Sequence, residues 1–239
     1  MADKRAIKVS TLDELAEGFQ ESRGITDKLT IKQMIAFAKE PVGGGENKLA
    51  KVLDSTITEI TANDLEGVTQ LRNYAFYHQY ELKSIEMANT ISGRVGDFAF
   101  SNCINLERVV ISDNVDRLNR YCFNECKKLT DKSIDFGSGL TWIYDYCFYN
   151  CTGLESITFP NQINTFGNYI FQGCTNLKTV RIGNGVRDYI YAISSLCFQY
   201  ADNITDIYID APENSVYNAP WGATKATVHW NTPLPSEET

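Results

Sequence analysis

A phenylalanine recurs along this chain at a nearly constant spacing. Six of them lie 24, 23, 25, 23 and 27 residues apart, at Phe76, Phe100, Phe123, Phe148, Phe171 and Phe198. The local sequence recurs as well, because residues 121–129 and 146–154 both read Tyr-Cys-Phe-x-x-Cys-x-x-Leu. A fixed period of this length indicates a chain built from repeated supersecondary units, each of which covers the apolar face of its neighbour.

Other apolar positions keep fixed distances from each phenylalanine. Five residues before it stand Leu71, Val95, Leu118, Ile143, Phe166 and Ile193, and six residues after it stand Leu82, Leu106, Leu129, Leu154, Leu177 and Ile204. Two residues before it stand Tyr74, Phe98, Tyr121, Tyr146, Tyr169 and Leu196, which we also expect in the core. In the third unit two extra residues delay the last apolar positions to Ile134 and Phe136.

Each unit ends in an alternating stretch such as Leu154–Phe159, which is typical of a half-buried β-strand. A period near 24 residues lies in the range of leucine-rich repeats. We therefore predict a leucine-rich-repeat solenoid of about six short strand rungs, stacked about 4.8 Å apart, with a small helical segment before it and a cap after it. The recurring phenylalanine is expected to fill the core at the turn between a short strand or helical turn and the main strand.

Seven cysteines follow the same repeat. Cys103, Cys126, Cys151 and Cys174 stand three residues after the phenylalanine, and Cys122, Cys147 and Cys197 stand one residue before it. Pairs such as Cys122 and Cys126 have the look of metal ligands, but the matching positions elsewhere hold Ala75, Ala99 or Ala201, which cannot bind a metal. We favour buried, reduced thiols inside the stack, with no metal and no cofactor, and a disulfide is not required.

Composition and motifs argue against several functions. The net charge of −8 and the absence of a basic run disfavour nucleic acid and anionic membranes as partners. The sequence shows no signal peptide and no apolar stretch of the roughly 18 residues that a membrane span needs. The two histidines, His78 and His229, lack a flanking nucleophile motif. We expect no enzymatic activity, although a pair of glycosidase carboxylates stays open because their separation is a three-dimensional matter.

The repeat resembles a known family. Residues 146–160 read Tyr-Cys-Phe-x-x-Cys-x-x-Leu-x-x-Ile-x-Phe-Pro, which is similar to the BspA-like leucine-rich repeats of bacterial surface proteins and gut-bacterial phages. The resemblance covers about residues 56–210. The chain departs from the usual pattern because only Pro160 follows a strand in the expected way. The resemblance implies a curved solenoid with a binding role, commonly adhesion.

The two ends of the chain suggest further units. Residues 1–42 read as a helical segment for attachment or oligomerisation, or else as a loosely ordered leader, and residues 43–51 as a glycine-rich linker. The repeats occupy 52–210, with a first rung in 50–67 that lacks its own phenylalanine unit. Residues 211–232 form a capping module in which Trp221 and Trp230 cover the last rung, and 233–239 form a flexible tail. Residues 25–49 and 211–230 resemble parts of phage-encoded proteins.

Outward strand positions form two ladders of side chains. One holds Glu86, Val110, Asp135, Thr158, Arg181 and Tyr208, and the other holds Ser84, Arg108, Ser133, Ser156, Thr179 and Asp206. This mixed polar face suits a protein loop or a glycan, although each position could equally be an ordinary solvated strand residue. The residues that we expect to bind are Arg108, Asp135, Thr158, Arg181, Asp206 and Tyr208.

These features lead to a functional hypothesis. The protein is expected to be a phage tail fibre or receptor-binding component, made in the cytoplasm and then part of the virion. Its expected partners are a host cell-surface protein or glycan, other phage tail proteins, and further copies of itself in a homotrimer. The alternative is a bacterial surface adhesin or host-interaction protein, and a glycan-active enzyme stands behind both.

Overall fold

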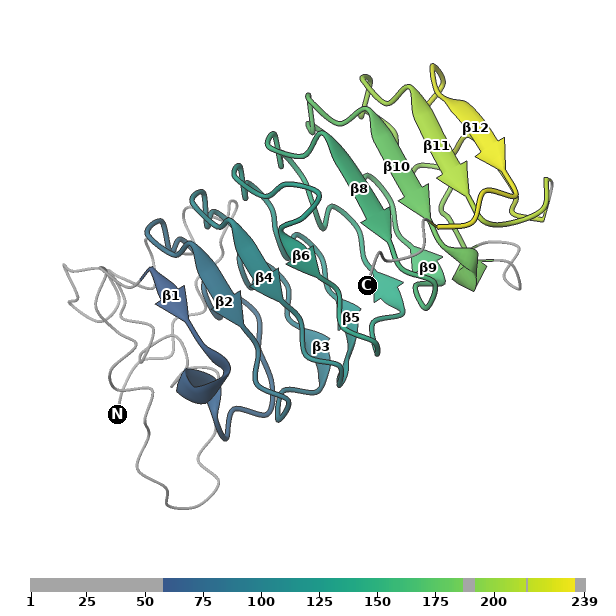
Figure 1. Ribbon diagram of the computed structural model, residues 1–239. Coiled ribbons are helices and arrows are strands. Elements are labelled where there is room, and N and C mark those ends of the chain that lie inside the picture. Colours follow the sequence, from purple (N-terminus) through teal and green to yellow (C-terminus); the bar gives the residue numbers. More distant parts are fainter. Residues whose placement is uncertain (1–57, 187–191, 214, 235–239) are drawn as a thin grey trace, which may run out of the picture.

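The computed structural model describes residues 58–186, 192–213 and 215–234. The helical segment expected at 1–42, the linker at 43–51 and residues 235–239 of the expected tail lie outside the described residues. The described chain winds into a solenoid with strands on two opposite sides (Figure 1). On one side lie β1 (Glu59–Ile60), β2 (Ser84–Glu86), β4 (Arg108–Val110), β6 (Ile134–Asp135), β8 (Ser156–Phe159), β10 (Thr179–Ile182), β11 (Asp206–Ile209) and β12 (Thr227–Trp230). On the other lie β3 (Gly93–Val95), β5 (Val115–Leu118), β7 (Trp142–Ile143) and β9 (Thr165–Phe166).

Every strand pairs in parallel with at least one strand of a neighbouring rung. The strand orders are β1-β2-β4-β6, β8-β10-β11-β12 and β3-β5-β7-β9. The fold class predicted from the period is confirmed: β1 belongs to the first rung expected in residues 50–67, and β12 adds one more rung at the C-terminal end. The side opposite the main strands is itself a sheet, and the helical turns of the described residues are the short 3-10 segments η2 (Ala62–Leu65) and η3 (Asn184–Val186).

The row of main strands is interrupted between β6 and β8. Ile134 pairs with Val109, so the delayed register predicted for the third unit is confirmed. The extra residues form a turn in which the Thr130 amide donates to the Ser133 hydroxyl at 2.8 Å. Among the described residues β8 pairs with β10 and not with β6, so the outward face consists of two separate sheets.

The repeating phenylalanines stack along the middle of the solenoid. Neighbouring rings from Phe76 to Phe198 lie 5.2–5.9 Å apart between centroids, with interplanar angles of 6–12°. Each ring is fully buried, and burying a side chain of this size contributes about 1.5–3 kcal/mol to the free energy of unfolding. The anchor position in the sequence is therefore the central column of the core.

All seven cysteines are buried, as the repeat position predicted, and all are free. Four of them also hold the rungs together, because each thiol donates a hydrogen bond to the carbonyl oxygen of the phenylalanine one rung earlier. The sulfur–oxygen distances are 3.1 Å for Cys103 to Phe76, 3.2 Å for Cys126 to Phe100, 3.0 Å for Cys151 to Phe123 and 3.0 Å for Cys174 to Phe148.

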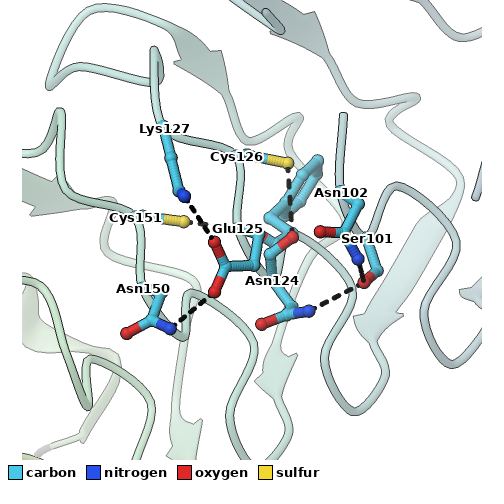
Figure 2. Close-up of polar contacts among 9 residues, drawn as sticks. Ser101, Asn102, Asn124, Glu125, Cys126, Lys127, Asn150 and Cys151 are labelled. Carbon is cyan, nitrogen blue, oxygen red and sulfur yellow. Dashed lines mark hydrogen bonds and ion pairs between the residues drawn. The ribbon is translucent and has the colours of Figure 1, made fainter. Parts of the chain in front are cut away.

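The turns after the second sheet form a ladder of their own. The Phe123 amide donates to the Cys147 carbonyl at 2.8 Å, and the Glu125 amide donates to the Tyr149 carbonyl at 2.8 Å. Side chains add further links between rungs, as Figure 2 shows: Asn124 donates to the Ser101 hydroxyl at 2.8 Å and Asn150 donates to Glu125 at 2.6 Å. These turns are therefore part of the stack and not loose connections.

The C-terminal segment closes the stack. Trp221 is fully buried, lies edge-to-face against Phe198 with 6.2 Å between ring centroids, and donates from its indole nitrogen to the Tyr217 carbonyl at 2.7 Å. Trp230 packs against Trp221, with 5.9 Å between the ring centroids. The segment that we expected to be a cap thus contains one more rung strand, β12, with an indole covering the last phenylalanine.

Candidate binding surface

The structure brings four of the six expected binding residues together. Thr158, Arg181 and Tyr208 lie in one row, in register across β8, β10 and β11, and Asp206 lies in the neighbouring row of β11. Arg108 and Asp135 belong to the other sheet, beyond the interruption between β6 and β8. The predicted continuous face is therefore two patches, and the larger cluster lies toward the C-terminal end of the stack.

Three side chains of that row are stacked on one another. The guanidinium carbon of Arg181 lies 4.0 Å from the centroid of the Tyr208 ring. On its other face, Tyr208 stacks on His229 of β12. The centroids of these two rings lie 4.3 Å apart, at an interplanar angle of 10°. Tyr208 thus contacts a cation on the rung before it and an imidazole on the rung after it, which orders all three side chains before any ligand arrives.

An acidic side chain completes this cluster. Asp206 and His229 share a 2.7 Å hydrogen bond between Oδ1 and Nε2, and the Thr205 hydroxyl donates to the other carboxylate oxygen at 2.7 Å. The bonds from His229 and Thr205 lower the pKa of Asp206 below its usual 3.8. We name Arg181, Asp206, Tyr208 and His229 the Arg181–Tyr208 cluster, and it presents positive, negative and aromatic groups side by side.

His229 was not among the expected binding residues. The signal that could have identified it is the alternating stretch Ala226–Trp230, which is in register with β11 and so places His229 beside Tyr208.

In the other patch, on the N-terminal side of the interruption, Arg108 and Asp135 are exposed. Ser133, expected on the outward ladder, is a correction: it is buried at 5% because its hydroxyl accepts the Thr130 amide in the inserted turn.

The opposite sheet carries an outward row that the sequence reasoning missed. Arg94, Arg117, Trp142 and Thr165 lie in register on β3, β5, β7 and β9. The signal was present in the repeat, because each of these residues stands six positions before a core phenylalanine. The Arg117 guanidinium lies 5.4 Å from the centroid of the Trp142 ring, and Trp142 is 39% exposed.

The aromatic position two residues before the phenylalanine also differs from expectation. Its members are only half-buried and stack along an edge of the solenoid. The ring centroids of Tyr121 and Tyr146, for example, lie 4.7 Å apart at an interplanar angle of 1°. The backbone explains the difference, because Tyr121 and Tyr146 have left-handed φ values of 55° and 58°. That conformation carries the side chain out of the core column, and stacking between rungs offsets the strain.

The described residues offer little for catalysis. They contain no group of three or more His, Cys, Asp or Glu side chains placed to hold a metal ion. Burial raises the pKa of Cys103 and of Cys174 to about 12, which leaves these thiols protonated and unreactive near neutral pH. A hollow beside Asp202, Gly222 and Lys225 measures about 10 Å³, the space of roughly one water molecule.

The described chain also has no helix of the length and apolarity that crossing a bilayer requires.

Parallel rungs, a period near 24 residues and a column of core phenylalanines define a leucine-rich-repeat solenoid. More narrowly, the chain belongs to the BspA type leucine-rich repeat family, whose model matches six copies over residues 54–135 and 93–220. Comparison with curated protein sequences gives no significant match.

Solved structures show the same fold. A leucine-rich repeat protein of T. pallidum is 19% identical with a TM-score of 0.52, covering 77% of this chain and 73% of that one. A leucine-rich repeat protein from Bacteroides ovatus is 24% identical with a TM-score of 0.52, covering 73% of this chain and 43% of that one. One from Eubacterium ventriosum is 18% identical with a TM-score of 0.52, covering 78% and 64%. The chain therefore spans less than two thirds of the last two proteins.

Proposed function

We propose that this protein is a non-catalytic adhesion protein that binds a cell-surface protein or glycan through the outward face of β8, β10, β11 and β12. The observation that carries the proposal is the Arg181–Tyr208 cluster, in which Arg181, Tyr208 and His229 are stacked in one row. Arginine and tyrosine dominate the energetics of protein interfaces, and side chains that are already ordered lose little entropy on binding.

The geometry of the cluster supports binding over catalysis. A nucleophilic hydroxyl would have to donate to the histidine that activates it. Here the Thr205 hydroxyl donates to Asp206, at 2.7 Å, and the imidazole of His229 is engaged by the same carboxylate and by the Tyr208 ring. The three groups therefore hold one another in place and leave no activated nucleophile.

We also propose the setting in which this adhesion takes place, a phage tail fibre or receptor-binding component that contacts the bacterial host. Its support comes from the sequence alone: residues 25–49 and 211–230 resemble phage-encoded proteins, and residues 1–42 are expected to form a helical segment for attachment or oligomerisation. Mass spectrometry of purified virions checks it: the intact chain among tail proteins is the expected result. Detection on the bacterial envelope in place of virions would instead favour the surface adhesin.

The binding proposal is tested with the full chain on a glycan array and on whole cells. The variant Arg181→Ala/Tyr208→Ala is expected to reduce binding about tenfold or more, as loss of an interface hot spot does. The matched control is Arg108→Ala, an exposed arginine on the same side beyond the interruption, which is expected to bind as the unmodified protein does. Binding that survives the double change, with an unchanged melting temperature, would remove the cluster from the proposal.

A further inference from the structure

Trp142 stands out on the sheet opposite the Arg181–Tyr208 cluster. It is 39% exposed at an outward position of β7, where the rungs on either side carry Arg117 and Thr165. An indole gains nothing from facing water, and on β3, β5 and β9 the matching position is filled by a polar side chain. A ligand that covers the ring would explain why an aromatic residue occupies this one rung.

The surroundings of Trp142 form an aromatic step of two inclined rings. The ring of Tyr144 lies 5.6 Å from that of Trp142 at 43°, so the two faces are inclined to one another. In the next rung the position beside Tyr144 is Gly167, which has no side chain to cover the phenol. One extended ligand can therefore contact Tyr144 together with the exposed Trp142, over which the Arg117 guanidinium already lies at 5.4 Å.

Positive charge lies directly beside this step. Arg94 and Arg117 are paired in register on β3 and β5, and both are exposed. Like charges in this arrangement repel one another. Arg117 has partial compensation from Asp116, with 3.4 Å between Nε and a carboxylate oxygen, while Arg94 has no ion pair with the residues that the structure describes. On a chain with a net charge of −8, this pair is a local basic patch.

We infer that this surface, the Trp142 platform formed by Arg94, Arg117, Trp142 and Tyr144, binds an acidic polysaccharide. The apolar face of a sugar ring packs on Trp142, and the carboxylates of neighbouring uronic acid units reach Arg117 and Arg94. Arginine is suited to this task because its planar fork binds a carboxylate with two hydrogen bonds. Rungs about 4.8 Å apart give a row of four positions about 15 Å long, which fits an extended chain of several sugars.

Charge decides against a polyphosphate ligand on the same platform. Nucleic acid binding requires several cationic contacts along each stretch of backbone, and this platform offers two arginines. A uronic acid polymer presents one carboxylate for each sugar and an apolar ring face between carboxylates. Two arginines beside two aromatic rings match that pattern.

The test uses the full chain and biotinylated polygalacturonate in biolayer interferometry. Trp142→Ala and Arg117→Gln are each expected to weaken the affinity about tenfold or more, and Arg94→Gln to weaken it less. The probe with fully methyl-esterified carboxylates is expected to bind at least about tenfold more weakly than the acid form. The double variant Arg181→Ala/Tyr208→Ala is expected to bind polygalacturonate unchanged, which separates this platform from the cluster on the opposite sheet.

Tryptophan fluorescence gives a second readout. Of the three tryptophans, Trp221 is fully buried and Trp230 packs against it on β12, at the far end of the stack. The exposed Trp142 is therefore the ring whose emission should shift when polygalacturonate is added, and the shift should vanish in Trp142→Phe. The inference is overturned if polygalacturonate does not bind, if the esterified polymer binds as tightly, or if Trp142→Ala binds like the unmodified protein. Stronger binding of duplex DNA that depends on the same arginines would overturn it too.

Discussion

The thiol of Cys126 donates a hydrogen bond to the carbonyl oxygen of Phe100 in the preceding rung, with 3.2 Å between sulfur and oxygen. The same carbonyl also accepts the amide of Cys103 at 3.1 Å. Phe100 therefore has both lone pairs of a buried carbonyl satisfied, one within its own rung and one from the next. Cysteine suits this position because it is small and apolar, as the core requires, and still provides a donor.

Replacing Cys151 with alanine is expected to lower the free energy of unfolding by about 1–3 kcal/mol, because the thiol's bond to the Phe123 carbonyl is lost and a small cavity remains. Ala201 occupies the same repeat position in a later rung, so alanine fits the backbone. The measurement is the thermal unfolding midpoint by circular dichroism. Cys151→Ser, which keeps a hydrogen-bond donor, should lower the midpoint less than Cys151→Ala does. If Cys151→Ala has the same midpoint as the unmodified protein, the thiol hydrogen bond contributes nothing to stability.

Alkaline pH should destabilise the solenoid through its thiols. Burial raises the pKa of Cys103 from its usual 9.0 to about 12, and that of Cys174 likewise to about 12. The folded state therefore keeps protons that the unfolded chain releases, so this contribution is complete below pH 9.0 and is lost as the pH rises toward about 12. Half-buried tyrosines with raised pKa values, such as Tyr121, act in the same direction.

The check is the unfolding midpoint measured from about pH 8 to about pH 10.5. The double variant Cys103→Ala/Cys174→Ala should have a lower midpoint at about pH 8 and a shallower fall with pH. The difference isolates the contribution of these two thiols from that of the tyrosines and of the other buried cysteines, whose pKa values burial also raises. At about pH 8 a thiol reagent should leave the native cysteines unmodified and react fully once denaturant is added. Rapid labelling of the native protein would contradict the burial of the ladder.

The stack was predictable because a solenoid is nearly one-dimensional. Once Phe76 and Phe100 are aligned, the position of each core side chain in one rung gives its position in the next. Even the late arrival of Ile134 followed from counting two extra residues. The consequence of that insertion did not follow, because whether β6 still pairs with β8 depends on how the turn at Thr130 packs in three dimensions.

Side-chain direction outside the main strands was the harder problem. Strand β7 is two residues long, Trp142 and Ile143, and so short a segment has no readable alternation. Tyr146 stands at a repeat position that is usually aromatic, so the sequence predicts a core residue. Its left-handed backbone conformation instead directs the side chain to the edge of the solenoid. His229 became part of the binding face only through the register of β12 with β11, since one histidine in a presumed cap carries no signal of its own.

Tyr146 offers a test of what maintains the left-handed turns. Its ring is stacked between Tyr121 at 4.7 Å and Tyr169 at 5.1 Å, and its φ is 58°. Tyr146→Ala should lower the free energy of unfolding by about 1–3 kcal/mol, because the two stacked ring contacts, worth about 0.5–1.5 kcal/mol each, are lost while the strain stays. Tyr146→Asn loses the same contacts but tolerates the backbone better and should be the milder change. The measurement is the melting temperature of each variant. If Tyr146→Ala and Tyr146→Asn have the same melting temperature, backbone strain is not significant at this turn.

Trp221 tests whether the end of the stack supports the proposed binding face. Truncating this fully buried indole to alanine should lower the free energy of unfolding by about 3–5 kcal/mol, because Phe198 loses its cover and the bond to the Tyr217 carbonyl disappears. Since rungs contact only their neighbours, the loss should be greatest in β11 and β12. Hydrogen exchange should therefore accelerate at Ile207 and much less at Val109 of β4, several rungs away.

Trp221→Phe is the matched control, because it keeps an aromatic ring over Phe198 and removes the indole donor. It should show a smaller loss and little change in exchange at β11. Because Tyr208 and His229 stand on the two strands that Trp221 supports, Trp221→Ala should also weaken binding at the Arg181–Tyr208 cluster while leaving the Trp142 platform, on β3, β5 and β7, able to bind. Uniform acceleration of exchange across all rungs would contradict this, since it would mean that the solenoid unfolds as one cooperative unit and that its end has no separate stability.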